Sequence, residues 1–548
     1  MGKPQKYELT LDKLFLATLI RSPEKEIVYR NIKRYNYVEF NQRIKRLANG
    51  LKNIGLGKNS KIGIIDWNTN YFLESLFAVP YTGAALHTIN LRLAPQEILY
   101  TINYVKDDAL ILRDEFIPLA EKLAPSITFI KQWIITSDDG SLPTTTLKPI
   151  IHIEDIIKNG NENYELQDLR EDMDAAVYFT SGTTGLPKAV HFTHRQIILQ
   201  SIISGIVITA YPSPVRVSSN DVLMHIPPFF HGLGWMMPYL ATLIGMKQVL
   251  PGRPDASVML DLIKKEKVTF AAGVPTFLKM LIEHPNAQEY KDALSNFKFL
   301  LDGEHPPRSL FFEAKKFGIN FIEAFGMSEG VGYTYAVPKD NMLDWPWEKL
   351  LDYFNTAGLP GPFVNVKIVD GNGNPVPKDF KTMGEILIQS PGITEGYWKD
   401  PEKTESSWTD DGWFKTGDLG VWSEDGYILI LDRAKDVIKS GGEWISSTRL
   451  EDMISNHPAV ARVAVIGVKS KKWSERPLAV IALKPEYKGK IKEEDIKDYL
   501  INEYVNKGKM AKWWLPDKIV FVEEIPLTSV GKLNKRALRD NFKEIELP

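Results

Sequence analysis

Cysteine is absent from the 548 residues of this chain. A chain without cysteine forms no disulfide, binds no zinc ion or iron–sulfur cluster through thiolates, and has no thiol nucleophile of its own. Lysine outnumbers arginine by 49 to 18, and high lysine with depleted cysteine is a thermophile-like bias. Any sulfur chemistry of this protein must therefore use a sulfur atom that a substrate supplies.

A large net charge is also absent. The 67 basic and 69 acidic residues leave a formal charge of −2, so the chain has no electrostatic footprint for nucleic acid and no polybasic membrane signal. Apolar residues make up 44% and charged residues 25%, which is ordinary globular usage. At about 100–200 residues per domain, the length predicts roughly three to five folding units.

A convincing membrane span or secretory signal is the third absence. No apolar core follows the charges at the start of the chain. Two stretches, 196–215 and 222–246, lack Asp, Glu, Lys and Arg, but the second holds prolines, glycines and histidines that a lipid-exposed helix could not satisfy. We expect a buried helix followed by a pocket-lining strand and loop, no membrane span, and a cytoplasmic protein.

The hydrophobic pattern predicts an α/β fold. Apolar runs at 61–65, 109–112 and 174–179 read as strands, and 70–82 reads as a helix, which suggests βαβ units and a parallel sheet. Residues 363–432 show short strands with turn signals and predict a small β-rich subdomain. From 433 onward, strands at 462–466 and 478–483 with helices from 451 and at 492–502 predict a separate small α+β domain.

The strongest local signal is Tyr-Phe-Thr-Ser-Gly-Thr-Thr-Gly-Leu-Pro-Lys at 178–188. Gly182 and Gly185 would let the backbone approach a ligand closely, and Lys188 adds a positive charge. Hydroxyl groups come from Thr180, Ser181, Thr183 and Thr184. A strand that runs into such a loop can form an anion-binding concavity. The string does not match the P-loop pattern GxxxxGK[ST], and the chain has no GxGxxG dinucleotide-binding pattern. A solvated Ser/Thr/Gly loop that binds no ligand would have the same composition.

This string closely resembles the AMP-binding signature of the adenylate-forming superfamily. The superfamily includes acyl-CoA synthetases, nonribosomal peptide adenylation domains and firefly-type luciferases. Further resemblances follow in the expected order through nearly the whole chain. They imply that residues 180–185 and Lys188 bind ATP and AMP, and that Thr184 acts in catalysis and on Mg²⁺.

Residues 323–329, Glu-Ala-Phe-Gly-Met-Ser-Glu, resemble the superfamily's aromatic-Gly-x-Thr-Glu motif. The resemblance implies that Phe325 lies on adenine, Ser328 contacts the α-phosphate and Glu329 helps to hold Mg²⁺, with Gly326 and Met327 in the same nucleotide site. A hard carboxylate oxygen suits Mg²⁺. The preceding string 301–306 resembles the loop that borders adenine, which implies nucleotide contacts from Gly303, Glu304 and His305.

Residues 412–418, Gly-Trp-Phe-Lys-Thr-Gly-Asp, closely match the ribose motif. Asp418 would accept hydrogen bonds from both ribose hydroxyls, which suits a carboxylate. The next string, 432–436, resembles the interdomain hinge, with Asp432 as the pivot and Arg433 on ribose. The resemblance thus divides the chain into an N-terminal AMP- and acyl-binding domain, 1–431, and a mobile C-terminal domain, 432–548.

Two motifs of the C-terminal domain carry further roles by resemblance. The loop 439–446 resembles the one that lines the pantetheine channel, and its CoA-binding residues would be Lys439, Gly441, Gly442, Glu443 and Trp444. The string 526–532 matches the C-terminal lysine motif. Lys532 would reach the carboxylate and the α-phosphate, where a cation stabilises developing negative charge. We expect the nearby Lys535, Arg536 and Arg539 to form a solvated helix face.

The string 227–235 resembles the acyl-pocket motif, and the closest branch is the medium- and long-chain fatty acyl-CoA synthetases of thermophile type. In that branch a Trp gates the acyl tunnel, and Trp235 falls on its position. The pocket would also include His231, also assigned to catalysis, together with Gly232, Val274 and Gly326. Acetyl-specific relatives carry a Trp at the place of Gly326, so we expect room for longer acids. Each methylene is worth only about 1–3 kcal/mol, so we expect a broad acid range.

Together these patterns predict an ATP-dependent, AMP-forming carboxylic acid–CoA ligase that activates a medium- or long-chain fatty acid, with Mg²⁺ as cofactor and ATP and CoA as co-substrates. Three alternatives stay open: a short hydroxy acid such as 4-hydroxybutyrate or 3-hydroxypropionate, an aryl acid, and a nucleotide-binding homologue that has lost catalysis. The family resemblance also suggests a homodimer, and we expect no nucleic-acid partner.

Overall fold

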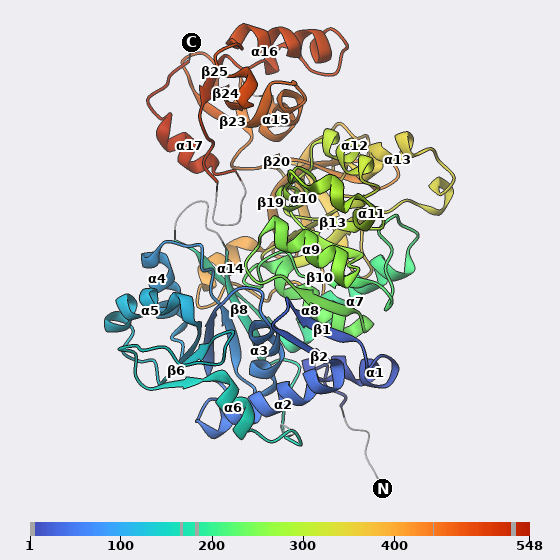
Figure 1. Ribbon diagram of the computed structural model, residues 1–548. Helices are drawn as coiled ribbons and strands as arrows, with labels where there is room; N and C mark the ends of the chain where they lie inside the picture. The colour runs from blue at the N-terminus through green and yellow to red at the C-terminus, as the bar shows by residue number, and fades with distance from the viewer. Residues whose placement is uncertain (1–5, 165–167, 181–185, 442, 528–532, 548) are drawn as a thin grey trace.

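The computed structural model describes residues 6–164, 168–180, 186–441, 443–527 and 533–547. The strands of these segments form four sheets of seven, nine, four and five strands. In Figure 1 the C-terminal elements lie together at one end of the molecule, above the two large sheets and their helices. The predicted α/β class with a small C-terminal domain is confirmed.

The seven-stranded sheet has the order β7-β6-β5-β3-β4-β8-β9. Its strands are β3 (Lys61–Ile65), β4 (Ala85–Thr88), β5 (Ala109–Arg113), β6 (Gln132–Thr136), β7 (Ile150–His152), β8 (Asp174–Thr180) and β9 (Lys188–Thr193). The predicted parallel pairing is confirmed except at β9, which runs antiparallel to β8. Only seven residues separate these two strands, too few for a parallel crossover.

The nine-stranded sheet has the order β16-β15-β14-β13-β12-β10-β11-β1-β2. Its strands are β1 (Glu26–Tyr29), β2 (Lys33–Asn36), β10 (Val222–Met224), β11 (Lys247–Leu250), β12 (Phe270–Gly273), β13 (Lys298–Leu301), β14 (Asn320–Met327), β15 (Gly330–Tyr335) and β16 (Leu359–Pro360). The N-terminal strand β1 pairs in parallel with β11, more than 200 residues away. The hairpin at the start of the chain therefore completes the far edge of the second sheet.

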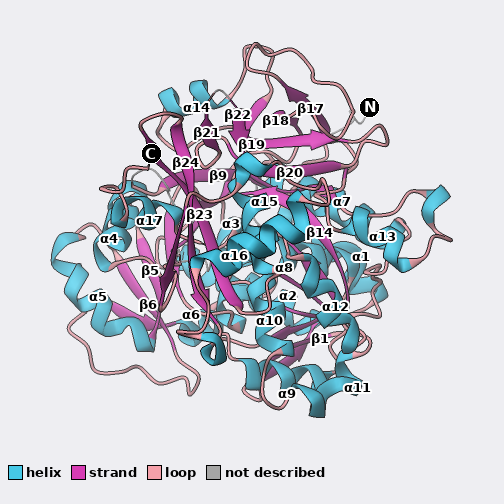
Figure 2. Cartoon of the chain, turned by 90° about the horizontal axis from the view of Figure 1, so that it is seen from above, coloured by secondary structure: helices cyan, strands magenta, loops and turns pink. Residues whose placement is uncertain are grey.

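The helices of the large part cover these two sheets, and most of them share one hydrophobic core with both sheets. They are α1 (Phe15–Arg21), α2 (Tyr37–Asn53), α3 (Asn70–Tyr81), α4 (Pro95–Val105), α5 (Ile117–Leu123), α6 (Ile153–Asn159), α7 (His194–Ala210), α8 (Gly232–Ile244), α9 (Ala256–Glu266), α10 (Pro275–Ile282), α11 (Lys291–Leu294), α12 (Arg308–Lys316) and α13 (Trp347–Phe354). Figure 2 shows how these helices surround the strands. The core joins both sheets into one N-terminal body.

The charge-free stretches are the helix α7 and the region from β10 to α8, and α7 packs against α8. The expectation of a strand and loop for 222–246 was incomplete, because residues 232–244 form a helix despite Pro238. No helix among the described residues is long and apolar enough to cross a membrane.

The predicted β-rich region is an antiparallel sheet of β17 (Asn365–Val369), β18 (Gly384–Gln389), β19 (Phe414–Trp422) and β20 (Ile428–Arg433). Between β18 and β19 lies the short helix α14 (Pro401–Ser407). The predicted ribose residue Asp418 lies within β19, and the predicted hinge residues Asp432 and Arg433 lie at the end of β20.

The C-terminal sheet consists of β21 (Ile438–Ser440), β22 (Glu443–Ile445), β23 (Val460–Ser470), β24 (Ser474–Leu483) and β25 (Lys518–Val522). Its helices are α15 (Ser447–Ser455), α16 (Glu493–Leu500) and α17 (Lys535–Asn541). The helix expected from residue 451 starts at Ser447, because the side chain of Ser446 accepts a hydrogen bond from Arg449 N and caps an earlier turn.

The expectation of a solvated face at Lys535 and Arg539 was wrong. Lys535 forms an ion pair of 2.7 Å with Glu451, with only 12% of its side chain exposed, and Arg539 pairs with Asp436 at 2.6 Å. These two basic residues, which periodicity alone would place in water, instead attach α17 to α15 and to the segment after β20. Arg536 is exposed, as expected.

Candidate functional site

The strands β8 and β9 present the two ends of the predicted phosphate loop next to each other. Thr180 pairs with Lys188 at the last rung of this hairpin. Between them lie the predicted loop residues Ser181, Gly182, Thr183, Thr184 and Gly185, which are outside the described residues. The structure therefore defines the frame of this loop: a partly exposed Thr180 and Lys188 at the end of a buried hairpin.

Glu329 lies in the turn between β14 and β15 and is buried. Its Oε1 accepts a hydrogen bond from the hydroxyl of Tyr397. Burial first, and then the charge of Glu329, raise the pKa of the Tyr397 phenol. The Lys188 amine lies 5.9 Å from the centre of the same ring. Tyr397 thus connects the phosphate-loop hairpin with the predicted metal-binding carboxylate, and sequence reasoning missed it because a single tyrosine carries no pattern.

The aromatic motif folds as a bulged strand end. Phe325 is buried against Tyr333, with ring centres 6.1 Å apart, and the β14–β15 register shifts between Phe325 and Met327. A Cβ on Gly326 would lie 2.9 Å from Gly332 N and 3.3 Å from Asp302 Oδ2. The glycine is thus also required by the close approach of β15, beyond any effect on acyl length.

The motif residues Met327 and Ser328 are partly exposed at the same strand end. In the loop after β13, His305 Nδ1 lies 2.9 Å from Glu323 Oε2. Burial lowers the pKa of His305, but the Glu323 carboxylate outweighs it and the net shift is upward. Gly303 has a φ of +92°, and Glu304 follows it. The structure thus brings the predicted adenine-border loop beside the aromatic motif.

The predicted ribose residues face each other across β19 and β20. Asp418 pairs with Arg433 in register, and Arg433 Nε lies 2.6 Å from Asp418 Oδ1. The Asp418 carboxylate raises the pKa of Arg433. Since Asp418 is buried and Arg433 partly exposed, the guanidinium holds the carboxylate in one orientation at the interdomain connection.

Asp432, the predicted pivot, is buried and joins the two domains. Its Oδ2 accepts hydrogen bonds from the amide and the hydroxyl of Ser447, at 2.5 and 2.6 Å. Its Oδ1 accepts from the amide of Arg433 at 2.8 Å. The Lys535 amine donates to Ser447 Oγ at 2.6 Å. The first turn of α15 is therefore attached to the last strand of the β-rich subdomain through one carboxylate.

The predicted CoA loop is the β21–β22 hairpin. Lys439 pairs with Trp444, whose side chain is 40% exposed. Gly441 has a φ of +61°, and a Cβ there would lie 2.7 Å from the Trp473 ring. Both the backbone conformation and this close contact therefore favour glycine at this position. Glu443 starts β22. Gly442 and the predicted catalytic Lys532 are outside the described residues.

The predicted acyl residues gather at the start of α8. His231 precedes this helix, and a Cβ on Gly232 would lie 3.3 Å from Val331 Cγ2 and 3.9 Å from the main-chain oxygen of Met327. Trp235, 1% exposed, packs on Tyr178 and Phe192. Val274 lies between the end of β12 and the start of α10. The structure brings Gly232 and the aromatic motif together and buries Trp235 in the core.

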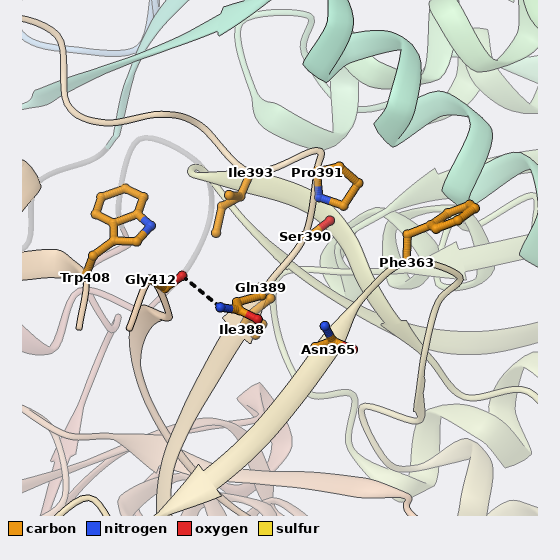
Figure 3. A pocket seen from close by; sticks show the side chains of 9 residues that line it. All are labelled: Phe363, Asn365, Ile388, Gln389, Ser390, Pro391, Ile393, Trp408 and Gly412. Carbon is orange, nitrogen blue, oxygen red and sulfur yellow. Dashed lines mark hydrogen bonds between the residues drawn. The ribbon is translucent and has the colours of Figure 1, made fainter. Parts of the chain in front are cut away.

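A separate pocket of about 280 Å³ opens beside the β-rich subdomain (Figure 3). Phe363, Trp408 and Ile393 contribute apolar walls, and Gln389 donates a hydrogen bond of 3.3 Å to the main-chain oxygen of Gly412. Gly412, the first residue of the predicted ribose motif, also lines this pocket. The pocket thus borders the ribose motif without including the residues assigned to substrates.

The family profile described as AMP-binding enzyme matches residues 16–398, and the profile of its C-terminal domain matches residues 449–532. The chain belongs to the AMP-binding enzyme family. The long-chain-fatty-acid–CoA ligase of Thermus thermophilus is 37% identical over 95% of this chain and 93% of its own length. The 4-hydroxybutyrate–CoA ligase 2 of Metallosphaera sedula is 31% identical over 94% of this chain and 91% of its own length. This protein is thus an AMP-forming acid–CoA ligase.

The fold of the ligase agrees with solved structures. ATP-bound MatB from Rhodopseudomonas palustris has a TM-score of 0.83 at 24% identity, over 98% of this chain and 99% of that one. The fatty acyl CoA synthetase of Mycobacterium tuberculosis has a TM-score of 0.72 at 23% identity, over 98% and 99%. These similarities concern the fold alone.

Proposed function

We propose that the ligase activates a medium- or long-chain fatty acid and transfers it to CoA. The observation that carries the choice of acid is the 37% identity to the Thermus thermophilus enzyme across nearly the whole chain. Support also comes from a medium-chain-fatty-acid–CoA ligase of Ectopseudomonas oleovorans, 33% identical over 93% of this chain.

In the first half-reaction, a carboxylate oxygen of the acid bonds to the α-phosphorus of ATP, and pyrophosphate leaves with the electron pair of the broken bond. Lys532 and Lys188 would stabilise the charge that develops on the phosphates. Asp418, oriented by Arg433 at 2.6 Å, would accept hydrogen bonds from the ribose hydroxyls. Phe325 would support adenine, and Ser328 would donate to the α-phosphate.

The donor set fits Mg²⁺ as a cofactor. No cluster of three or more His, Cys, Asp or Glu side chains that could hold a metal occurs among the described residues. The buried carboxylate of Glu329 is one hard oxygen ligand, and Mg²⁺ commonly takes one or two carboxylates with the rest from water and phosphate. Glu329, with Thr184, would hold the ion, which would neutralise phosphate charge when bound.

In the second half-reaction, the CoA thiolate bonds to the acyl carbon and AMP leaves. Since the chain has no cysteine, the acyl group cannot rest on an enzyme thiol between the two steps. We assign the boundary between residues 431 and 432 as the point of rotation, with Asp432 as the pivot that exchanges Lys532 for the hairpin of Lys439, Gly441 and Trp444. We also propose that the ligase is a homodimer.

The test is a panel of acids from butyrate to long chains, with 4-hydroxybutyrate, 3-hydroxypropionate and an aryl acid, scored by kcat/KM for thioester formation with ATP, Mg²⁺ and CoA. We expect the highest values for medium or long fatty acids. A kcat/KM for a hydroxy or aryl acid at least ten-fold above every fatty acid would overturn the choice of acid. ATP–pyrophosphate exchange without CoA tests the adenylation step alone, and its absence with every acid would indicate a homologue without catalysis.

A further inference from the structure

Two lysines from different elements lie against one tyrosine ring at the phosphate-loop hairpin. Lys188 Nζ, at the start of β9, is 5.9 Å from the centre of the Tyr397 ring, and Lys403 Nζ, on α14, is 5.5 Å from it. Both distances are within cation–π range. The hydroxyl group of the same tyrosine contacts an anion, because it donates a hydrogen bond to the Glu329 carboxylate.

This arrangement is held by the backbone. Tyr397 bridges Val190 of β9, and the next amide, Trp398 N, donates to Ala189 O at 2.9 Å. Tyr397 N donates in turn to Thr404 Oγ1 at 2.9 Å, which ties it to α14. The three groups therefore keep their relative positions without help from a long loop.

The start of α14 is also fixed. Asp400 Oδ1 accepts a hydrogen bond from Lys403 N at 3.0 Å, and Asp400 O accepts one from Thr404 Oγ1 at 2.8 Å. Gly396 is packed so closely on this helix that a Cβ there would lie 2.7 Å from Thr404 Cγ2. The main chain that carries Lys403 is therefore anchored to the main chain that carries Tyr397.

The two amines are not neutralised by the part of the protein that the structure describes. Within those residues, neither Lys188 nor Lys403 has a carboxylate oxygen within ion-pair distance, although the chain as a whole is nearly neutral. Burial, and after it the positive charge of Lys188, lower the pKa of Lys403, while Glu329 and Asp400 act in the opposite direction. Like charges held near each other and partly desolvated are stabilised by a bound anion.

The anion that the proposed reaction would bring to Lys188 is the pair of terminal phosphates of ATP. We propose that Lys403 binds these phosphates, and the pyrophosphate formed from them, together with Lys188. The inference rests on the proposed adenylation step and adds to it a second lysine from α14, outside the strings that resemble superfamily motifs. The ammonium of Lys403 would contact a phosphoryl oxygen, while the Tyr397 ring lies against both amines and its hydroxyl holds one carboxylate oxygen of Glu329.

The experiment compares Lys403→Ala and Lys403→Arg with the wild-type chain and with Lys399→Ala as a matched control. Lys399 lies four residues earlier and is exposed, and its amine donates to the main-chain oxygen of Tyr104 at 3.1 Å. Calorimetric titration with magnesium pyrophosphate measures binding without an acid substrate. ATP–pyrophosphate exchange measures the apparent KM for pyrophosphate, and thioester formation from supplied acyl-AMP and CoA measures the second step.

For Lys403→Ala we expect about ten-fold or greater weakening of pyrophosphate binding and a matching rise in its KM, since a charge-assisted hydrogen bond is lost. Lys403→Arg should recover most of the affinity, and Lys399→Ala and the second step should be unchanged. Pyrophosphate affinity of Lys403→Ala within two-fold of wild type, or an equal loss in both half-reactions, would overturn the assignment. If the wild-type chain binds pyrophosphate in calorimetry but shows no exchange, the proposed function is contradicted, and a ten-fold weaker binding by Lys403→Ala would still support the role of Lys403.

Discussion

Asp432 Oδ2 accepts two hydrogen bonds from Ser447, at 2.5 Å from its amide and 2.6 Å from its hydroxyl. The carboxylate ends the β-rich subdomain and the serine begins the first helix of the C-terminal domain. A residue expected to act as a pivot is therefore also the attachment point of α15. The two roles can be separated experimentally.

Asp432→Ala should destabilise the C-terminal domain by about 1–3 kcal/mol, because two buried donors of Ser447 lose their acceptor. Ser447→Ala should cost less, since it removes only the hydroxyl. Denaturant unfolding of both variants and of the double variant measures the coupling between the two side chains. Strictly additive effects would show that the hydrogen bonds contribute nothing to stability.

Lys532→Ala should abolish acyl-AMP formation and largely spare thioester formation from supplied acyl-AMP. The reason is that a cation on the α-phosphate is needed while charge develops during adenylation. Rapid-quench measurement of each half-reaction checks this, with the exposed Lys543→Ala as the control. An equal loss in both half-reactions would refute the role of Lys532.

Asp418→Ala should raise the KM for ATP by about ten-fold or more, because charge-assisted hydrogen bonds to the ribose are lost and Arg433 loses its partner. The KM for CoA, measured with supplied acyl-AMP, should change little. Asp425→Ala is the control, since Asp425 makes an exposed ion pair with Lys339. An unchanged KM for ATP would remove Asp418 from the nucleotide site.

Trp235→Ala should cost about 3–5 kcal/mol of stability, because the side chain is fully buried between aromatic rings. Trp235→Phe keeps much of this packing and tests the gate. A gate predicts a changed ratio of kcat/KM between long and medium acids. Trp133→Phe, a buried tryptophan of another cluster, controls for lost packing. Equal chain-length profiles for both variants would leave Trp235 with a core role alone.

Acid should destabilise the protein through His194. Burial lowers the pKa of this imidazole to about 3, and its Nδ1 accepts a hydrogen bond from the amide of Leu11 at 3.2 Å. The unfolded chain binds a proton near pH 6.5 but the folded chain does not, so stability is present above pH 6.5 and is lost as pH falls towards 3. At pH 4.5 this loss is about 3 kcal/mol for one histidine.

Denaturant unfolding between pH 7.5 and pH 4.5 measures this loss. His194→Gln should reduce the pH dependence, since glutamine does not titrate and its carbonyl can accept the same hydrogen bond. The partly exposed His284→Gln should leave the dependence as it is. A wild-type slope retained in His194→Gln would assign the acid sensitivity to other groups.

Local sequence was sufficient where short-range physics decides the structure. The apolar run at 61–65 is β3 and the run at 109–112 lies in β5, because continuous apolar segments of this length are buried strands in a parallel sheet. Resemblance to superfamily motifs likewise pointed to Asp418 and Arg433, which the structure places 2.6 Å apart. The two residues are close because they are partners on neighbouring antiparallel strands, β19 and β20. A short hairpin between the two motifs was therefore sufficient to bring them together.

Long-range partners were beyond such reasoning. Nothing in residues 26–29 indicates that β1 pairs with β11, since only the shared core decides which sheet edge it completes. Lys535 looked like a surface residue until α17 packed on the C-terminal sheet and brought Glu451 to 2.7 Å. Tyr397 and Lys403 are ordinary in sequence and gain meaning from the hairpin beside them.

The amino-acid sequence by itself determined the chemistry that is available: no protein thiol, a nearly neutral chain, and strings that resemble the superfamily motifs in one order. These are properties of residue type and spacing, which folding does not change. Only the tertiary structure decided which polar and charged groups meet, as in the hydrogen bond from Ser447 to Asp432 and the two amines of Lys403 and Lys188 on the Tyr397 ring. Such pairs depend on burial and on distances of a few ångströms between segments far apart in the chain, where electrostatic and hydrogen-bond energies vary most strongly.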